Sequence, residues 1–251
     1  MENVIEIHNL TCGYEDKTVI HNLSLNIRKG KITSIIGENG CGKSTLLKTI
    51  GRIIQPTQGE LLLNGRNIHR TNTAEIAKVL GLLPQSPTVP NGLTVQEIVE
   101  YGRFPHKKGR GKLNAHDHAI VSWALAQANL TDLRENLLAE LSGGQRQRAW
   151  IAMVLAQETD VILLDEPTTY LDMVYQLEVL ELVQRLSQEK GITVVMVIHD
   201  LNLASRFSDE LVMLKDGRLL EQGSPRQTMT PAVLREIFRI EIGRASCRER
   251  V

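Results

Sequence analysis

A glycine-rich segment, GENGCGKST at residues 37–45, constrains this chain more than any other stretch. It matches the pattern G-x-x-x-x-G-K-[ST], in which glycines without Cβ atoms let successive backbone N–H groups point inward at phosphate oxygens. The lysine adds a positive charge for the outer phosphates, and the serine hydroxyl is a ligand for Mg²⁺. The helix that follows directs the positive end of its dipole at the same anion. The segment therefore predicts a phosphate-binding loop between a strand and a helix.

The flanking sequence supplies that context. Residues 31–36 read as an apolar strand, and Leu46, Leu47 and Ile50 mark the apolar face of a helix after the loop. Four fixed positions match by chance in roughly one chain of this length per hundred. The alternative is an idle glycine turn, which does not require this strand and helix.

Composition and charge limit the other classes of function. The chain has 251 residues and 42% hydrophobic content, enough for a sizeable core. Lys plus Arg and Asp plus Glu are both 29, so charge gives no argument for nucleic acid or an acidic membrane surface. Cys12, Cys41 and Cys247 have neither metal-ligand spacing nor even pairing, which favours a reducing compartment. We expect no membrane-spanning segment and no secretory signal, because no apolar run approaches 18 residues.

The first third of the chain reads mainly as strands. Residues 4–10 and 20–27 alternate apolar and polar side chains, as in half-buried antiparallel strands, and residues 59–65 form a further strand closed by an Asn-Gly turn. Tyr14, in the predicted turn at 13–16, either stacks on a purine or is an ordinary surface tyrosine. A short helix is predicted over 74–80, and a strand over 79–83 leads to Gln85. That glutamine reaches a metal or a water, or is simply a loop residue.

From about residue 86 the pattern changes to helices, with no convincing strand until residue 161. This change predicts an inserted helical subdomain. Thr94 and Glu97 have the spacing of a capping box, so a helix is expected from Val95 to just before Pro105. A second helix is expected over 115–128. The basic stretch 106–112 between them is interpreted as a solvated loop, with contact to lipid headgroups or a partner as the alternative.

The second half supplies further candidate site residues. Ser142, Gly143, Gly144 and Gln145 precede a helix pattern at 146–157, which is another anion-binding arrangement, although it has no lysine. Residues 161–164 read as a strand buried on both faces, and ligands bind at the carboxyl ends of such strands. At that end Asp165 can hold Mg²⁺ through its coordinated water, and Glu166 can orient or deprotonate an attacking water. The alternative is a pair of acids that merely ends a strand.

The same edge of the sheet is expected to receive a histidine. Residues 192–198 form the next predicted buried strand, and His199 follows it, either as a hydrogen-bond donor to a terminal phosphate or as a structural histidine. Before this strand, Asp172 precedes an amphipathic helix that Gly191 closes. A hairpin is predicted over 211–222, and a last helix begins at Thr230–Pro231.

Taken in order, these motifs resemble the ATP-binding cassette (ABC) ATPase family over about residues 4–238. The resemblance implies an α/β fold, with a P-loop NTPase (RecA-like) core, an N-terminal antiparallel β-subdomain and an inserted α-helical subdomain. It implies one domain at 1–240, with the core at about 1–85 and 148–240 and the helical subdomain at about 86–147. Residues 241–251 have no apolar period and are expected to be a non-native tail.

The resemblance also implies roles for single residues, with ATP and Mg²⁺ as the ligands. Tyr14 matches the residue that stacks on adenine, and Glu166 matches the catalytic base. Lys43, Gln85 and His199 complete the catalytic set. Asp172 lies in the D-loop after Glu166 and is implied to be a nucleotide-binding residue. The implied metal ligands are Ser44, Gln85 and Asp165. The implied nucleotide-binding residues are Gly37, Glu38, Asn39, Gly40, Cys41, Gly42, Lys43, Ser44 and Thr45, together with the signature Ser142, Gly143, Gly144 and Gln145.

Three further stretches narrow the resemblance. EPTTYLD at 166–172, HDLNLA at 199–204 and YGRFPH at 101–106 are similar to the ATPases of bacterial importers for ferric siderophores, whose relatives carry haem and cobalamin. This implies a head-to-tail dimer with a second copy, in which the signature of one copy closes over residues 37–45 of the other. It also implies an integral membrane permease at the cytoplasmic face, docked near Gln85 and the helix at 95–103, and an indirect link to a substrate-binding protein. No nucleic-acid partner is expected. The runner-up is a soluble, non-transport ABC ATPase such as a cluster-assembly partner.

Overall fold

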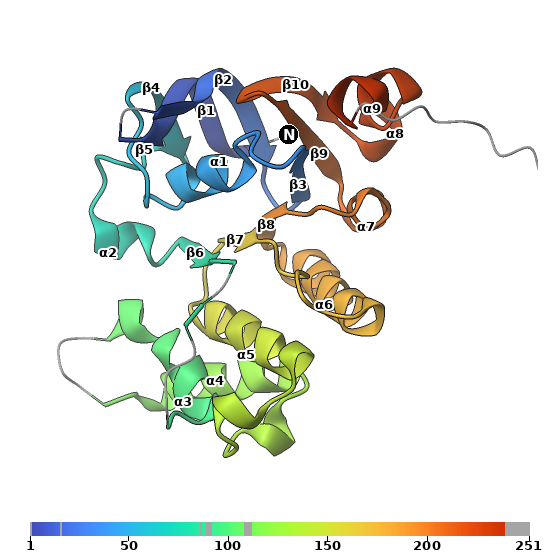
Figure 1. Ribbon diagram of the computed structural model, residues 1–251. Coiled ribbons are helices and arrows are strands. Elements are labelled where there is room, and N and C mark those ends of the chain that lie inside the picture. The colour runs from blue at the N-terminus through green and yellow to red at the C-terminus, as the bar shows by residue number, and fades with distance from the viewer. Residues whose placement is uncertain (1, 16, 86, 89–91, 108–111, 239–251) are drawn as a thin grey trace, which may run out of the picture.

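The computed structural model describes residues 2–15, 17–85, 87–88, 92–107 and 112–238 (Figure 1). The predicted tail at 241–251 and the middle of the basic stretch at 106–112 lie outside the described residues.

A six-stranded sheet forms the centre of the molecule, in the order β10-β9-β3-β8-β7-β6. Neighbouring strands from β9 to β6 are parallel, and β10 pairs antiparallel with β9. Residues on β3, β7 and β8 are buried throughout, as expected for strands covered on both faces. The bounds are β3 Ile32–Gly37, β6 Leu80–Leu83, β7 Val161–Asp165, β8 Thr193–Val197, β9 Glu210–Lys215 and β10 Arg218–Gly223.

A second, antiparallel sheet has the order β2-β1-β4-β5. Its strands are β1 Asn3–Tyr14, β2 Lys17–Arg28, β4 Gln58–Leu63 and β5 Arg66–Asn67. β1 and β2 are longer than the alternation predicts. Asn9 and Asn22 adopt positive φ angles of 50° and 46°, beside shifts in register that let pairing continue where the alternation breaks. Tyr14 is consequently the last residue of β1, paired with Lys17, and not a turn residue.

Helix α1 (Lys43–Ile50) lies against both sheets. Leu46, Leu47 and Ile50 are 0% exposed and belong to a core that also contains side chains from β1, β2, β3, β7 and β8. The other face of the six-stranded sheet is covered by helices, because alternate residues of each strand enter a second core with α5 and α6. The parallel sheet is therefore buried on both faces.

The insert is helical, and Figure 1 shows it as a separate layer below the sheets. It contains α3 (Val95–Tyr101), α4 (Ala115–Gln127) and α5 (Gly143–Ala156), with short 3₁₀ turns at Phe104–His106, Thr131–Leu133 and Leu138–Glu140. Thr94 caps α3 in the predicted capping box with Glu97. Helices α3, α4 and α5 share a core whose members include Val99, Leu125 and Ile151.

The remaining helices are α2 (Thr73–Ile76), α6 (Met173–Lys190), α7 (Leu201–Phe207), α8 (Pro225–Thr228) and α9 (Pro231–Phe238). Helix α2 is shorter than the predicted 74–80, because from Leu80 the chain pairs with Val161 as part of β6. Gly191 ends α6 with φ 67°, as predicted. In the described part of the chain no helix is long and apolar enough to span a bilayer.

Candidate nucleotide site

Four neighbouring parallel strands bring the predicted site to one edge of the sheet. The strands β3, β8, β7 and β6 are adjacent, with Leu83 aligned to Leu164 and Asp165 aligned to Val197. Their carboxyl ends therefore lie side by side, and the residues that follow them meet there. β3 ends in the 37–45 loop, β6 leads to Gln85, β7 ends at Asp165 and leads to Glu166, and β8 leads to His199.

The loop adopts the conformation that its glycines permit. Gly42, the N-cap of α1, has φ 106°, and a Cβ built on it would lie 2.6 Å from Ile20 Cδ1. A Cβ on Gly37 would lie 2.3 Å from the backbone oxygen of Leu214. Gly40 also has a positive φ, 80°, but space around it is open. Gly42 thus requires glycine for conformation and space together.

Lys43 is buried inside the loop, at 5% exposure. Its Nζ donates hydrogen bonds to the backbone oxygens of Gly37 and Glu38, both at 2.9 Å. The cation is therefore held within the turn, at the N-terminus of α1, where an anion is favoured. Asn39 is exposed, and Thr45 is buried in the first turn of α1. Burial raises the pKa of the Cys41 thiol, so this residue stays a neutral, small spacer.

Ser44 and Asp165 bring two oxygen ligands together. Ser44 Oγ donates to Asp165 Oδ1 at 2.9 Å, and Asp165 is 3% exposed. Burial raises the pKa of Asp165, while the hydrogen bond from Ser44 and the charge of Lys48 oppose that rise. Hydroxyl and carboxylate oxygens are the ligands that Mg²⁺ prefers, usually with phosphate oxygens and waters completing its shell. The donor set fits this ion.

Glu166 is the centre of a hydrogen-bond cluster at the same edge. Gln85 Nε2 donates to Glu166 Oε2 at 2.5 Å, Thr169 Oγ1 donates to the same oxygen at 2.9 Å, and His199 Nε2 lies 2.5 Å from Glu166 Oε1. Burial raises the pKa of Glu166, but the hydrogen bonds from His199, Thr169 and Gln85 outweigh it and lower the pKa below its ordinary value. The carboxylate is therefore held ionised.

The predicted signature residues lie elsewhere, at the N-terminus of α5. Ser142 caps α5, and its backbone N–H donates to Gln145 Oε1 at 3.0 Å. Gly143 is exposed, whereas a Cβ on Gly144 would lie 2.6 Å from the Tyr175 ring. Among the described residues no hydrogen bond joins Ser142–Gln145 to the 37–45 loop. The structure does not bring the two predicted anion-binding elements of one chain together.

The two remaining predicted site residues, Asp172 and Tyr14, lie at the end of a helix and at the end of a strand. Asp172 caps α6 by accepting from the backbone N–H of Tyr175 at 3.2 Å. Tyr14 is 47% exposed at the tip of the β1–β2 hairpin. The start of β2 packs beside the loop through Ile20, so this tip flanks the phosphate-binding turn.

Thr169 is one member of the cluster that the sequence did not suggest. Its hydroxyl reaches Glu166 only because the chain reverses after β7, where Thr169 N–H donates to the Glu166 backbone oxygen at 3.2 Å. Glu166 itself has φ 52°, a left-handed conformation that turns the chain at this point. A threonine in a turn carries no pattern of its own, so nothing in the sequence marks it.

Comparison with known proteins gives the family. The family model described as ABC transporter matches residues 20–169. The iron(3+)-hydroxamate import ATP-binding protein FhuC of Bacillus subtilis is 50% identical over 95% of this chain and 89% of its own length. The petrobactin import ATP-binding protein FpuC of Bacillus anthracis is 46% identical over 95% of this chain and 88% of its own length.

Solved structures agree with the sequence relatives. A putative metal-chelate type ABC transporter in an inward-facing conformation matches 96% of this chain and 90% of its own, with TM-score 0.84 and 32% identity. The ATP-binding cassette MJ0796, in a dimeric post-hydrolysis state bound to ADP and Pi, matches 88% of this chain and 99% of its own, with TM-score 0.76 and 32% identity. The chain therefore belongs to the ABC transporter family as an ABC ATPase, a domain that binds ATP.

Proposed function

We propose that this chain is the ATP-hydrolysing subunit of an importer for ferric siderophores or related metal chelates, and that it acts through a separate membrane permease. The observation that carries the proposal is the identity of 50% and 46% to import ATPases over almost the whole chain. Those two relatives are named for different chelates, so the proposal specifies the class of cargo only. Because these relatives are import ATP-binding proteins, we favour import over the alternative function of a cluster-assembly ATPase.

Within the ATP site we assign the phosphates to the 37–45 loop. Lys43 exchanges its hydrogen bonds to the backbone oxygens of Gly37 and Glu38 for the outer phosphate oxygens of ATP. Ser44, Asp165 and Gln85 would hold Mg²⁺, and the exposed Tyr14 would stack on adenine. When bound, the ion neutralises charge on the phosphates.

Glu166 is assigned as the general base. Its lowered pKa keeps the carboxylate ionised and ready to accept a proton from a water aimed at the terminal phosphate. Gln85 and His199 hold its two oxygens, which sets the direction in which it can accept. Through these contacts with Glu166, both side chains are also assigned to orienting that water.

We assign the surface that closes over ATP bound at the 37–45 loop to a second copy of the chain. Gly143 and Gly144 offer backbone N–H groups in the first turn of α5 that have no partner among the described residues, and they do not bond to the loop of their own chain. In a head-to-tail dimer they close over the loop of the partner, with Asp172 near the contact. MJ0796, whose dimer binds ADP and Pi, is a structural precedent for such pairing.

We further propose that residues 1–240 are one ABC ATPase domain, with the core at about 1–85 and 148–240 and the helical subdomain at about 86–147. The permease docks at the segment where Tyr101 and Phe104 are exposed, at 54% and 75%, and at the loop that holds Gln85. The chain then works at the cytoplasmic face of the membrane, held there by the permease. A substrate-binding protein delivers the chelate on the other side.

One experiment tests the importer. The chain is co-expressed with its permease, purified from membranes and reconstituted in vesicles, and uptake of ferric siderophore, haem, cobalamin and free metal ions is measured with and without ATP. ATP-dependent uptake of a ferric siderophore is expected. An ATPase that fractionates without any dependence on the permease, and drives no uptake, would contradict the proposal.

A further inference from the structure

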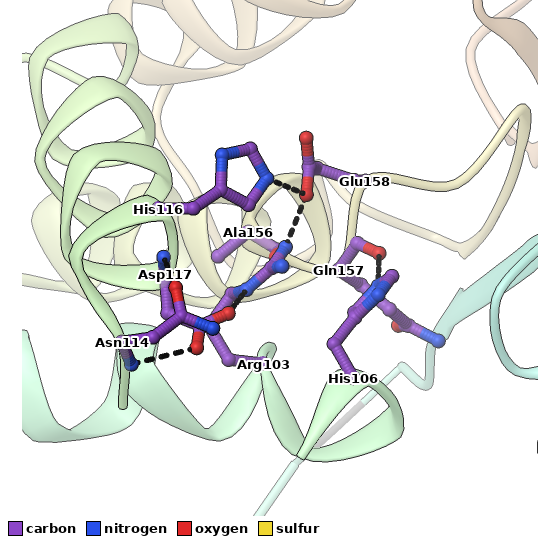
Figure 2. A network of polar contacts seen from close by, with 8 residues as sticks. All are labelled: Arg103, His106, Asn114, His116, Asp117, Ala156, Gln157 and Glu158. Carbon is purple, nitrogen blue, oxygen red and sulfur yellow. Dashed lines mark hydrogen bonds and ion pairs between the residues drawn. The ribbon is translucent and has the colours of Figure 1, made fainter. Parts of the chain in front are cut away.

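A buried arginine fixes the segment 101–106 onto the end of α5. Arg103 is 1% exposed. Its Nε donates to Asp117 Oδ1 at 2.9 Å, and its Nη1 donates to the backbone oxygen of Ala156 at 2.8 Å and to Glu158 Oε2 at 2.6 Å (Figure 2). One guanidinium therefore joins the end of α3, the start of α4 and the end of α5. We call Arg103, Asp117, the Ala156 carbonyl and Glu158 the Arg103 anchor.

The partners of Arg103 suit a buried cation. Asp117 caps α4 by accepting from the Asn114 backbone N–H, a bond that lowers the pKa of Asp117, and Arg103 lowers it further. The Ala156 oxygen lies in the last turn of α5, where carbonyls lack partners within the helix and the dipole is negative. Two carboxylates and one helix C-terminal carbonyl therefore compensate the buried positive charge of Arg103.

The residues on either side of Arg103 hold the same contact. A Cβ on Gly102 would lie 2.1 Å from the backbone oxygen of Met153, so only glycine lets the segment approach α5 this closely. His106 Nε2 lies 2.8 Å from the backbone oxygen of Gln157, the C-cap of α5. Gly102, Arg103 and His106 therefore hold the inner side of the segment against the C-terminal end of α5.

The outer side of the segment is free and apolar. Phe104 is 75% exposed and Tyr101 is 54% exposed, in the described part of an insert whose other large apolar side chains are mostly packed. Arg103 directly precedes Phe104, so a displacement of the Phe104 ring is passed to Arg103 across one peptide bond. Because the anchor is buried and hydrogen-bonded, the segment and α5 move together.

Helix α5 then reaches both parts of the ATP site. Its N-terminus carries Ser142–Gln145. At its other end, Gln157 Nε2 donates to the backbone oxygens of Ala77 and Leu80, at 2.6 Å and 3.4 Å, at the start of β6. β6 leads to Gln85, which donates to Glu166. The C-terminus of α5 is a junction between the exposed rings, the signature and the strand before Gln85.

We propose that Arg103 is a positioning residue that transmits displacement of the exposed segment to α5, and so couples the permease to the ATP site. This inference rests on the proposed function. A merely structural role predicts that weakening the anchor lowers ATPase activity equally with and without the permease. Transmission predicts that only the effect of the permease is lost.

The test uses Arg103→Lys, which keeps the charge but loses the planar fork that spans several acceptors. ATPase activity is measured for the isolated chain and for its complex with the permease in lipid nanodiscs, and the ratio of the two rates is the readout. We expect the isolated chain to keep its kcat and its KM for ATP, and the ratio to fall at least about fivefold. Arg134→Lys is the matched control, because Arg134 forms an exposed pair with Glu135 on the same insert.

His106→Ala is the second variant, since it removes one tie of a partly exposed residue and leaves the buried guanidinium in place. It is expected to lower the ratio as well, by less than Arg103→Lys. A ratio equal to the wild-type ratio in both variants would overturn the anchor, whether or not the isolated rates change. A wild-type complex whose ATPase rate equals that of the isolated chain would overturn this inference, whereas a complex that drives no ATP-dependent uptake would overturn the proposed function.

Discussion

The chemistry at the residue scale depends on how Glu166 is held. A carboxylate at the end of a buried strand would ordinarily have a raised pKa, as Asp165 does one residue earlier. At Glu166 three donors, from Gln85, Thr169 and His199, reverse that effect of burial. Two neighbouring acids therefore have pKa values shifted in opposite directions, because their hydrogen-bond partners differ.

Replacing the base separates binding from turnover. Glu166→Gln is expected to lower the ATPase rate at least about a hundredfold, because the amide cannot accept a proton from water. Binding of ATP is expected to persist, and an ATP-bound dimer to accumulate. Phosphate release and light scattering measure the two effects. Glu135→Gln, at an exposed position, is the control, and full hydrolysis by Glu166→Gln would refute the assignment.

The lowered pKa of Glu166 also predicts a dependence of stability on pH. A carboxylate with a depressed pKa stabilises the folded state above its ordinary value of 4.5, and this stabilisation is lost as pH falls through the folded-state pKa. The wild type is therefore expected to lose stability relative to Glu166→Gln as pH falls below about 4.5. Thermal unfolding of both proteins from pH 6 to pH 3 measures the difference in Tm. A wild type that gains stability relative to Glu166→Gln as pH falls through this range would contradict the assigned direction of the shift.

The sequence predicted the positions of those candidate site residues that directly follow a buried strand. Asp165, Glu166 and His199 follow runs of apolar residues, and parallel strands place such residues at one edge. Gln85 was left open between a ligand and a loop residue, because a single glutamine carries no periodicity. Thr169 was missed since its contact depends on the positive φ of Glu166, a feature of the folded backbone alone.

At the scale of elements, the 37–45 loop links two strands and a helix by close packing. Gly42 begins α1 and also touches the Ile20 side chain of β2, so its conformation is fixed from two directions. Gly40, two residues away, has a similar positive φ but no neighbour where a Cβ would be placed. Comparing Gly42 with Gly40 therefore separates the effect of backbone conformation from the effect of packing.

Gly42→Ala is expected to cost about 2–5 kcal/mol of folding free energy, from the left-handed conformation and the overlap with Ile20 together. Gly40→Ala is the matched control and is expected to cost about 1–2 kcal/mol, from conformation alone. Urea unfolding of both variants measures the difference. Equal costs would show that the contact with β2 does not constrain the loop.

Element boundaries followed the sequence where local signals agreed with tertiary pairing. The capping box at Thr94 and the glycine at 191 set helix ends correctly. The helix predicted over 74–80 stops at Ile76, because pairing of Leu80 with Val161 withdraws those residues into the sheet. The predicted β1 was too short for a related reason, since the positive φ of Asn9 keeps the strand paired through a bulge.

At the scale of the whole molecule, each chain contains both proposed faces of the ATP site, and no hydrogen bond among the described residues joins them. The loop and Glu166 lie at the edge of the sheet, whereas Ser142 begins α5 in the layer below (Figure 1). The proposed head-to-tail dimer completes two such sites at once. The sequence indicated the two faces, and the family resemblance implied that they come from different copies of the chain.

Ser142→Arg tests this arrangement. We expect the isolated chain to bind ATP with unchanged affinity, because Ser142 does not contact its own loop, and the ATPase rate to fall about a hundredfold or more. Ser224→Arg, at another serine that begins a short helix, is the control. Equilibrium binding and phosphate release are the measurements. Loss of ATP binding by the isolated Ser142→Arg chain would mean that one chain closes its own site.

The hydrogen bonds around Glu166 have one more consequence. Three side chains already donate to this carboxylate in the single chain, whereas an ionised carboxylate has about four sites that can accept a hydrogen bond. That leaves room for about one further donor, such as a single water. Under the proposed function, the fold therefore restricts Glu166 to one water before ATP binds.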